Sequence, residues 1–370
     1  MTSHMIDWIS ARVPCFHPVP LDGGRVMKIA PDGSIQWEVA SRLEVEGSHS
    51  SNLLLRTYGI NLDGQGVILE ISGNPTKWMQ GHNLFGGFLA PTPLVELLMY
   101  RLCEILPGLQ PTDLDLRRWR DGHVELQRVD VNRMFALGKP SHVRAWLRAA
   151  EHSAYLKHRG KGTLTKDGTL YFGKHSRRWA AKFYAKGDEL ESGKDHALPR
   201  TIEVEDATWL TGWAADKLRF EVVLRAMELK HRGLRWAFDW SDTTGAEILK
   251  GIAEGIQMSD QLTLPITALQ NLPIRLRMVY ETWLNGTDLR ATLPKNSFYR
   301  YRRQLLPHGV DIAIRQPHED RSNVIPLVRV LEAVPATLPD WVHGTSLLLG
   351  STDLDEARRK FRESRKSRAA

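Results

Sequence analysis

Alternating apolar and polar residues fill most of the first 240 positions of the chain and predict strands more often than helices. Short β-rich runs are separated by Gly, Asn and Asp turns, the pattern of an antiparallel sheet. We expect strands at residues 9–13, 25–29, 34–39, 52–58, 66–72, 123–135, around 162–186 and at 217–225. Helices with one buried face are expected at residues 91–106, where positions 94, 97, 98, 102 and 105 are apolar, and at 141–151. The predicted class is α+β, a mainly antiparallel sheet with packed helices.

The pattern becomes mostly helical after residue 241. Helices expected at residues 275–283, 288–293 and 295–306 have the spacing of a helix-turn-helix motif. In the third helix an inward apolar stripe would leave basic side chains for phosphates or guanine edges, namely Lys295, Arg300, Arg302 and Arg303. The alternative is a basic amphipathic helix packed on the first domain. We therefore divide the chain into a catalytic domain (5–240), a helical DNA-binding domain (241–330) and a tail (331–370). Residues 187–197, rich in charge and Gly, are expected to form an exposed loop.

Composition limits the possible partners. The 370 residues are 42% hydrophobic and 25% charged, as in an ordinary globular protein, and 50 Lys and Arg face 43 Asp and Glu. This excess favours a polyanionic partner without identifying it. Because Cys15 and Cys103 are the only cysteines, a metal site would have to use carboxylates, imidazoles and water. No apolar run approaches the roughly 20 residues of a membrane span, so we expect a cytoplasmic protein without a membrane partner.

A tyrosine between lysines is the first candidate for chemistry. On an alternating strand Lys182, Tyr184 and Lys186 share one face. Cations or a metal near a phenol lower its pKa from about 10 and make it a better nucleophile, and the lysines could also neutralise a phosphate under attack. The alternative is a sheet tyrosine among solvated lysines. Tyr155 is a rival nucleophile, but it follows an apolar helical segment, which favours core packing.

Carboxylates inside apolar strands are the second candidate, because a buried charge needs a partner or a metal. Glu70, Asp130 and Glu221 each occupy such a position, and we expect them on neighbouring strands. One interpretation is that they converge beside Tyr184 and hold Mg²⁺ or Mn²⁺. The other is a solvated sheet face with cross-strand arginine pairs. His82, in a loop, is a further candidate ligand or phosphate contact, although such a histidine is more often structural or exposed.

Several short motifs, in a shared order, resemble the gene II/X family of filamentous-phage and plasmid replication initiators. They lie at residues 5–8, 12–14, 70–72, 80–85, 128–130, 183–186, 218–221, 288–290 and 297–300. The resemblance implies an enzyme that nicks and rejoins one strand at a double-stranded origin with a divalent metal, leaving a 3′-OH for the host polymerase. It also implies that Tyr184 is the nucleophile and Lys186 the nearby lysine. The His-hydrophobic-His metal motif of many rolling-circle initiators is absent from this sequence, which favours the carboxylates as ligands.

The partners implied by this resemblance are double-stranded origin DNA, its single-stranded product, and host helicase and polymerase. Two other functions stay open at this point. One is a noncatalytic origin binder or repressor, in which the helix-turn-helix acts alone. The other is a mobilisation relaxase, which would perform the same chemistry at a transfer origin.

Overall fold

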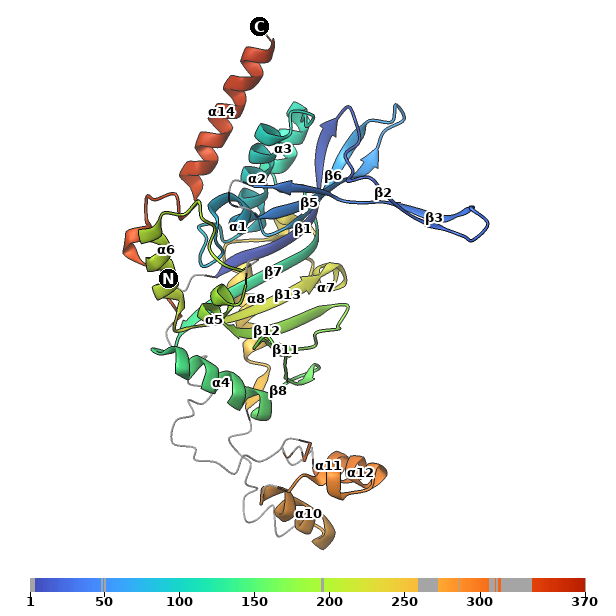
Figure 1. Ribbon diagram of the computed structural model, residues 1–370, viewed down its shortest axis with the longest axis vertical. Coiled ribbons are helices and arrows are strands. Elements are labelled where there is room, and N and C mark those ends of the chain that lie inside the picture. Colours follow the sequence, from blue (N-terminus) through green and yellow to red (C-terminus); the bar gives the residue numbers. More distant parts are fainter. Residues whose placement is uncertain are drawn as a thin grey trace.

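The computed structural model of the protein describes residues 4–47, 49, 51–193, 196–258, 272–285, 287–305, 310, 312–313 and 335–369. Among these residues, nine strands form one sheet in which every neighbouring pair is antiparallel (Figure 1). The order across the sheet is β10 (Thr163–Leu164), β11 (Leu170–Phe172), β12 (Trp179–Ala185), β13 (Lys217–Arg225), β7 (Glu125–Ala136), β1 (Met5–His17), β6 (Gly66–Gly73), β5 (Asn52–Ile60) and β4 (Leu43–Glu46). The predicted α+β class with a mainly antiparallel sheet is confirmed.

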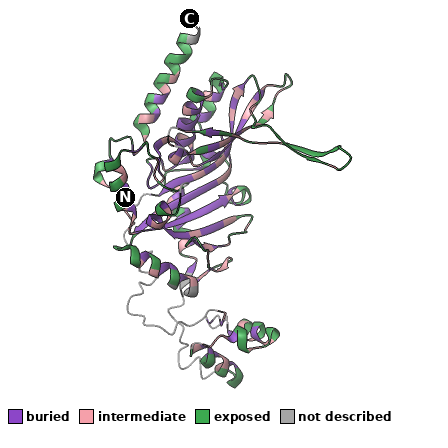
Figure 2. Cartoon of the chain, in the orientation of Figure 1, coloured by how far each residue is buried: buried purple, intermediate pink, exposed green. Residues whose placement is uncertain are grey.

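The two faces of this sheet differ, as the alternation in β1 shows. Ile9, Ala11 and Val13 are buried in the main hydrophobic core, whereas the residues between them are half-buried. We call the side that carries Trp8, Ser10 and Arg12 the polar face. Strands in the middle of the sheet are nevertheless mostly buried on both sides (Figure 2).

Helices supply the other half of the main core. In α2 the predicted apolar positions 94, 97, 98 and 102 are buried, but Ile105, in the last turn, is 45% exposed. Helix α3 starts at a capping box in which Thr112 and Asp115 bond each other's backbone N–H. Besides α14 (Ser351–Ala369), which is described below, the helices in this core are α1 (Pro75–Gln80), α2 (Pro91–Ile105), α3 (Asp113–Arg120), α4 (Pro140–Ser153), α7 (Ala226–His231) and α8 (Thr244–Ala253).

The first structural unit extends past residue 240. Helix α8 contributes Ile248, Leu249 and Ile252 to the main core, and β14 (Ile256–Met258) pairs with β8 (Ala154–Leu156), which also pairs with β9 (Gly160–Lys161). A 3₁₀ helix, η1 (Ala237–Asp239), precedes α8. Both α8 and β14 thus pack with the sheet although their positions fall in the range expected for the helical domain.

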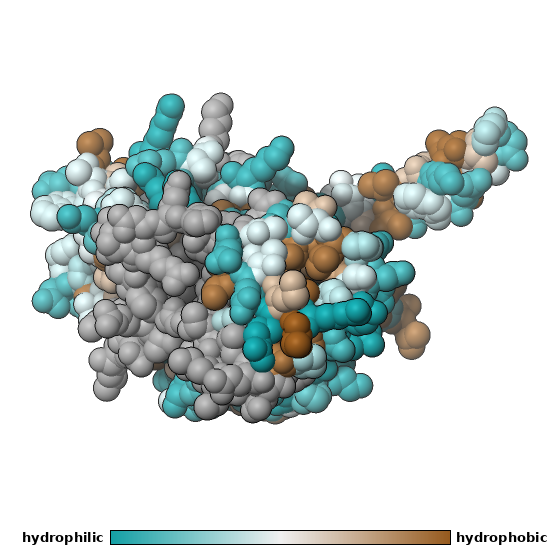
Figure 3. All heavy atoms as spheres, turned by 90° about the horizontal axis from the view of Figure 1, so that it is seen from below, coloured by the Kyte–Doolittle hydropathy of each residue, from teal (hydrophilic) through white to brown (hydrophobic). Residues whose placement is uncertain are grey.

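A hairpin leaves the body of the molecule between β1 and β4. It consists of β2 (Arg25–Ile29) and β3 (Ile35–Ala40), and almost every residue of both strands is exposed. Figure 3 shows hydrophobic side chains along this projecting arm. Val26, Trp37 and Val39 are exposed there. Its two strands lie close to the predicted ranges.

The segment expected to be an exposed loop contains a helix. Helix α5 (Lys186–Glu191) begins directly at the end of β12, and Leu190 is buried in a second hydrophobic cluster with α6 (Val204–Ala214). The expectation of a loop over residues 187–197 was therefore wrong for its first part. Of the charges that suggested a loop, Glu191 is exposed and Asp188 is half-buried, while Glu189 pairs with the buried Lys186. The short helix covers one end of the sheet.

Three helices near the C-terminus have a hydrophobic core of their own, which includes Tyr280, Trp283, Phe298 and Leu305. They are α10 (Ile274–Leu284), α11 (Leu289–Thr292) and α12 (Lys295–Leu305), each within two residues of its predicted bounds. Most of residues 306–330, the rest of the expected DNA-binding domain, lie outside the described residues.

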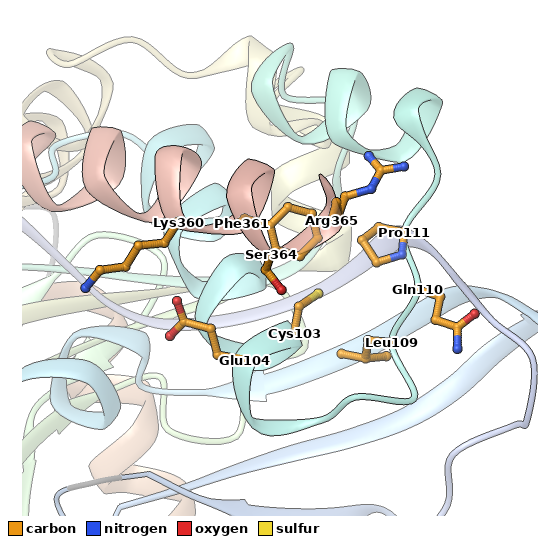
Figure 4. Close-up of a pocket in the computed structure, with 9 residues that line it drawn as sticks. All are labelled: Cys103, Glu104, Leu109, Gln110, Pro111, Lys360, Phe361, Ser364 and Arg365. Carbon is orange, nitrogen blue, oxygen red and sulfur yellow. The ribbon is translucent and has the colours of Figure 1, made fainter. Parts of the chain in front are cut away.

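The expected tail ends in a long helix, α14 (Ser351–Ala369), which follows the 3₁₀ helix η4 (Asp340–Val342) and packs on α2. Arg358 of α14 forms an ion pair with buried Glu96, and Phe361 contacts Tyr100. A pocket of about 710 Å³ opens beside this contact, lined by Cys103, Leu109 and Phe361 among others (Figure 4). No helix in the described part of the chain is long and apolar enough to cross a membrane.

Candidate active site on the polar face of the sheet

Tyr184 and Lys182 project from β12 toward two residues of β13. Lys182 lies opposite Glu221 and Tyr184 opposite Arg219, so all four side chains share the polar face. The phenol of Tyr184 donates a hydrogen bond to Glu221 Oε2 (3.1 Å), and Lys182 Nζ lies 2.6 Å from Glu221 Oε1. Burial alone would lower the pKa of Lys182, but Glu221 and Asp130 hold it above its usual value. Glu221 thus connects the tyrosine to a lysine that stays charged.

Asp130 comes from the next strand, β7. Asn132 lies opposite Glu221, and Asp130, two residues earlier, shares the same face. Arg128 binds Asp130 with two donors, Nε at 2.8 Å and Nη2 at 2.6 Å. Burial raises the pKa of Asp130 to about 7, with a further contribution from the charge of Glu221 that Arg128 only partly offsets. The negative charge of Glu221 thus makes ionisation of Asp130 less favourable.

Asp7 and Arg219 complete the network, and the sequence analysis did not select either of them as a site residue. The register of β1 against β7 shifts at Asp7, and Arg219 Nη2 lies 2.9 Å from Asp7 Oδ1. Burial opposes the ionised form of Asp7, but Arg219 and two lysines lower its pKa. The search for carboxylates inside apolar strands, which selected Glu70, would also have found Asp7 between Ile6 and Trp8.

Lys186 reaches the network from a different element than predicted. Strand β12 ends at Ala185, and Lys186 starts α5 rather than continuing the alternation. Its Nζ donates to Asn83 Oδ1 (2.8 Å), pairs with Glu189, and lies 6.0 Å from the centre of the Tyr184 ring. Burial lowers the pKa of Lys186 to about 8, against the opposing effect of Glu189. The helix, not the strand, places this lysine beside the tyrosine.

The phenol of Tyr184 is neutral in this arrangement. Burial raises its pKa well above the usual value, and the nearby Arg219 does not compensate for that. The sequence had suggested the opposite shift, because flanking lysines were expected to dominate. Tyr184 also lines a pocket of about 170 Å³ together with Lys182, Thr169, Glu189 and His196. Tyr184 itself is 8% exposed, so little of its surface faces this pocket.

The four predicted metal ligands do not meet at one point. Asp130 and Glu221 are brought together on adjacent strands, but β1 separates β6, which carries Glu70, from β7. Glu70 is held instead by arginines, as the alternative interpretation had it. His82 is buried against Phe85, and burial lowers its pKa to about 3. In the described ranges no three His, Cys, Asp or Glu side chains form a group that could hold a metal ion.

Asp130 and Glu221 nevertheless fit one kind of metal site. Mg²⁺ is commonly held by one or two carboxylates, with water and substrate phosphate as the other ligands, rather than by a cage of protein side chains. Burial is the main cause of the raised pKa of Asp130, and the charge of Glu221 adds to it. The pair suits such a two-carboxylate site, whereas a site made of all four predicted residues does not fit.

Comparison with known proteins identifies the family. The family of the N-terminal part of the replication-associated gene II protein matches residues 5–243, and the family of its C-terminal part matches residues 269–348. The chain belongs to the gene II protein family. It is 41% identical over 338 residues to the replication-associated gene II protein of Enterobacteria phage I2-2, covering 90% of this chain and 95% of that protein. The predicted resemblance to the filamentous-phage gene II/X initiators is thereby confirmed.

A solved structure is also similar, the rolling circle replication initiator protein from Geobacillus stearothermophilus. The similarity covers 70% of this chain and 87% of that chain, with 17% identity and a TM-score of 0.29, which is too low to establish a shared fold.

The candidate catalytic residues and the candidate DNA-binding helix lie in different segments that match the family. The whole network around Tyr184 lies within the N-terminal segment, and α12 lies within the C-terminal one. On α12, Lys295, Arg300 and Arg303 are exposed, while Arg302 is half-buried. Tyr155, the rival nucleophile, is on β8 of the small sheet opposite Lys161 and Gln257, not in the network. Helix α14 follows both matched segments.

Proposed function

We propose that the protein initiates rolling-circle replication by nicking and rejoining one strand of origin DNA, with Tyr184 as the nucleophile. Membership of the gene II protein family supports the biological role. The observation that carries the chemistry is the hydrogen bond from the Tyr184 phenol to Glu221, at the edge of a pocket and among three cations. A nucleophile, an adjacent base and charges for a phosphate are the parts that transfer of a phosphodiester to tyrosine needs.

In this mechanism Tyr184 oxygen attacks the scissile phosphorus in line. Its proton passes to Glu221, a new oxygen–phosphorus bond forms, and the bond from phosphorus to the 3′-oxygen breaks. The products are a 5′-phosphotyrosyl link and, after the leaving oxygen gains a proton, a 3′-OH. The bond energy of the phosphodiester is retained, so a later 3′-OH can attack the link and close the strand without ATP.

Positive side chains would stabilise the phosphate during this transfer. Lys182 and Arg219 stay charged, and Lys186, with a pKa of about 8, is mostly protonated at neutral pH. A buried cation acts strongly on the pentacovalent phosphate because little water screens it. The burial that raises the pKa of Tyr184 is the opposing cost, which Glu221 would offset by accepting the phenolic proton as the oxygen attacks.

A divalent cation, Mg²⁺ or Mn²⁺, is part of the proposal. Asp130 and Glu221 are the residues that would hold it, with phosphate oxygens and water as the remaining ligands. When bound, such an ion neutralises charge on the phosphate. Asp130 would be ionised above its pKa of about 7, which suits binding at neutral pH.

The helices α10 to α12 would hold the duplex. Their order and lengths agree with a helix-turn-helix in which α12 enters a groove, and the exposed Lys295, Arg300 and Arg303 would contact phosphates or guanine. Host helicase and polymerase would then act on the nicked origin.

Incubation with supercoiled replicative-form DNA and Mg²⁺ tests the proposal. We expect a single nick at one position of one strand, and a tryptic peptide that contains Tyr184 and carries a 5′-linked nucleotide. Specific binding without any nick would indicate an origin-binding repressor. A nick at a transfer origin instead would indicate a mobilisation relaxase, and an adduct on Tyr155 would move the nucleophile.

A further inference from the structure

Three arginines surround Glu70 on the polar face, at some distance from Tyr184. Arg56 of β5 and Arg42, just before β4, lie 2.8 and 2.9 Å from Glu70 Oε1, and Arg12 of β1 lies 3.6 Å from Oε2. The Glu70 side chain is only 7% exposed, whereas those of Arg56 and Arg42 are 31% and 39% exposed. The carboxylate thus lies underneath and orients the guanidinium groups outward, where donors that Glu70 does not use remain available.

The charge of this cluster is not balanced. Glu125, the other nearby carboxylate, pairs with Arg12 (3.4 Å) and with Arg235. Two carboxylates therefore face four arginines that are all partly exposed. This excess of positive charge suits an anionic ligand. Planar guanidinium groups held in place are well suited to bind phosphate with two donors each.

An aromatic ring adjoins the arginines. Tyr58 of β5 is 48% exposed, and the guanidinium of Arg12 lies 3.6 Å from the centre of its ring. A second pair of this kind, Arg128 over Trp8, follows on the same face. Phosphate-binding cations next to aromatic rings are typical of surfaces for single-stranded nucleic acid, since a base can stack on a ring only when it is not stacked in a duplex.

The cluster and Tyr184 are connected across the sheet. Arg12 lies opposite Glu70, and Glu70 opposite Arg56, so the arginines share the polar face. Arg128 and Arg225, opposite each other on β7 and β13, continue the row toward Lys182 on β12. Five strand spacings of about 4.8 Å separate β12 from β5. The row also runs along the strands, because Arg12 is opposite Glu125 on β7, seven residues from Asn132, which is opposite Glu221. Its diagonal length is roughly 33 Å, about ten nucleotides at the 3.4 Å rise of a stacked strand.

We propose that Arg12, Arg42, Arg56 and Tyr58 form a binding subsite for the single DNA strand that continues from the scissile phosphate, with Glu70 as the residue that positions the arginines. The proposal rests on the proposed function for what lies at the Tyr184 end of the row. It gives Glu70 a role in binding DNA rather than a metal.

The test measures binding separately from cleavage. Fluorescein-labelled dT20 is titrated with the full chain carrying Tyr184→Phe, and anisotropy is recorded at several salt concentrations. Adding Arg42→Ala or Arg56→Ala should weaken binding and reduce the salt slope by roughly 0.7, the value for one phosphate contact to a single strand. Tyr58→Ala should weaken binding roughly 5- to 100-fold with an unchanged salt slope, since it removes a stacking contact.

Arg25→Ala is the matched control, because Arg25 is an exposed arginine that pairs with Glu38 on the hairpin. It should bind dT20 like the parent chain. Since Tyr58 is exposed and outside the core, Tyr58→Ala tests the subsite even if an arginine variant folds poorly. Binding of dT20 that is unchanged in Arg42→Ala, Arg56→Ala and Tyr58→Ala would overturn the subsite, as would a loss confined to duplex DNA.

The two proposals fail in different ways. If the wild-type chain never nicks supercoiled DNA but the variants lose dT20 binding, the proposed function is wrong and the subsite stands. If the wild-type chain nicks and the variants bind dT20 normally, only the subsite is wrong.

Discussion

Individual residues of the Tyr184 network illustrate how burial and neighbouring charge compete. Burial raises the pKa of both Tyr184 and Asp130, because a charged group loses its hydration there. Asp7 is held in its charged form although it is also buried, because Arg219 lies beside it. The two carboxyl groups differ in their neighbours: Asp7 is near Arg219, Lys186 and Lys182, whereas Asp130 is near Arg128 and Lys182 but also near the charge of Glu221.

Replacing Tyr184 by Phe removes the proposed nucleophile but keeps the ring in its buried position. Nicking of supercoiled DNA should fall by at least roughly 10⁴-fold, as for removal of other catalytic nucleophiles. Stability should fall by about 1–2 kcal/mol, since Glu221 loses a hydrogen-bond donor. Gel assays and urea unfolding measure the two effects. Tyr155→Phe is the control and should nick normally; loss of nicking there, with activity kept in Tyr184→Phe, would contradict the assignment.

Asp130→Asn should change how stability depends on pH. The pKa of Asp130 is about 7 in the folded chain and near 3.9 when unfolded. Between these values the folded chain binds a proton that the unfolded chain does not, so Asp130 makes the protein less stable as pH rises from about 4 to 7. Asn at position 130 does not ionise, so the variant does not lose stability in this way. Relative to wild type it should gain roughly 2–4 kcal/mol between pH 4.5 and 7.5.

Urea unfolding without divalent metal at both pH values measures this gain. Asp63→Asn, a change at an exposed turn, serves as the control and should follow the wild type. A constant difference between Asp130→Asn and wild type across the range would show that Asp130 is ionised throughout.

At the scale of elements, the sequence predicts those helices and strands whose structure follows from a local pattern of apolar residues. It does not predict those that depend on packing with distant parts of the chain. Period-2 alternation located the middle of β1, and the spacing of apolar residues located α2 and α10 to α12, because each of these elements buries one face. The range expected for β13 also matches, although β13 is buried on both faces. The loop expected at residues 187–197 failed because Leu190 alone anchors α5 to another cluster. Pattern also does not give strand order. Glu70 and Asp130 look alike in sequence, but β1 lies between their strands, so only Asp130 joins the active-site network.

The proposed role of α12 in binding duplex DNA can be tested separately from cleavage. If this helix reads duplex DNA, replacing both Arg300 and Arg303 by Ala should weaken duplex binding and reduce the salt slope by roughly 2, about one unit per lost phosphate contact. Cleavage of a single-stranded origin oligonucleotide should be retained, because Tyr184 lies in the other segment that matches the family. Lys250→Ala, at an exposed position of α8, is the control. Normal duplex binding with lost single-strand cleavage would place α12 in the active site instead.

At the scale of the whole molecule, the C-terminal helix packs on the domain formed by the first part of the chain. Helix α14 packs on α2, more than 250 positions earlier in the sequence, and Leu354 and Ala357 join the main core. Both segments that match the gene II protein family end before this helix. Sequence alone could not predict the contact, because α14 has a highly charged composition and its few apolar residues resemble those of a solvated helix.

Arg358 is the residue through which this docking can be tested. Its Nε and Nη2 lie 2.8 and 2.7 Å from the two oxygens of Glu96, which is 1% exposed. Arg358→Ala would leave that carboxylate with Tyr100 as its remaining donor, and an uncompensated buried charge costs roughly 3–5 kcal/mol. Because Arg358 is itself partly exposed, we expect the free energy of unfolding to fall by about 2–4 kcal/mol, measured by urea unfolding.

Arg359→Ala is the control, because it removes an exposed pair with Glu363 and should change stability by less than about 0.5 kcal/mol. Adding Glu96→Leu to Arg358→Met should recover most of the loss, since it removes the buried charge. Equal stabilities of Arg358→Ala and Arg359→Ala would mean that α14 does not dock on α2 in solution.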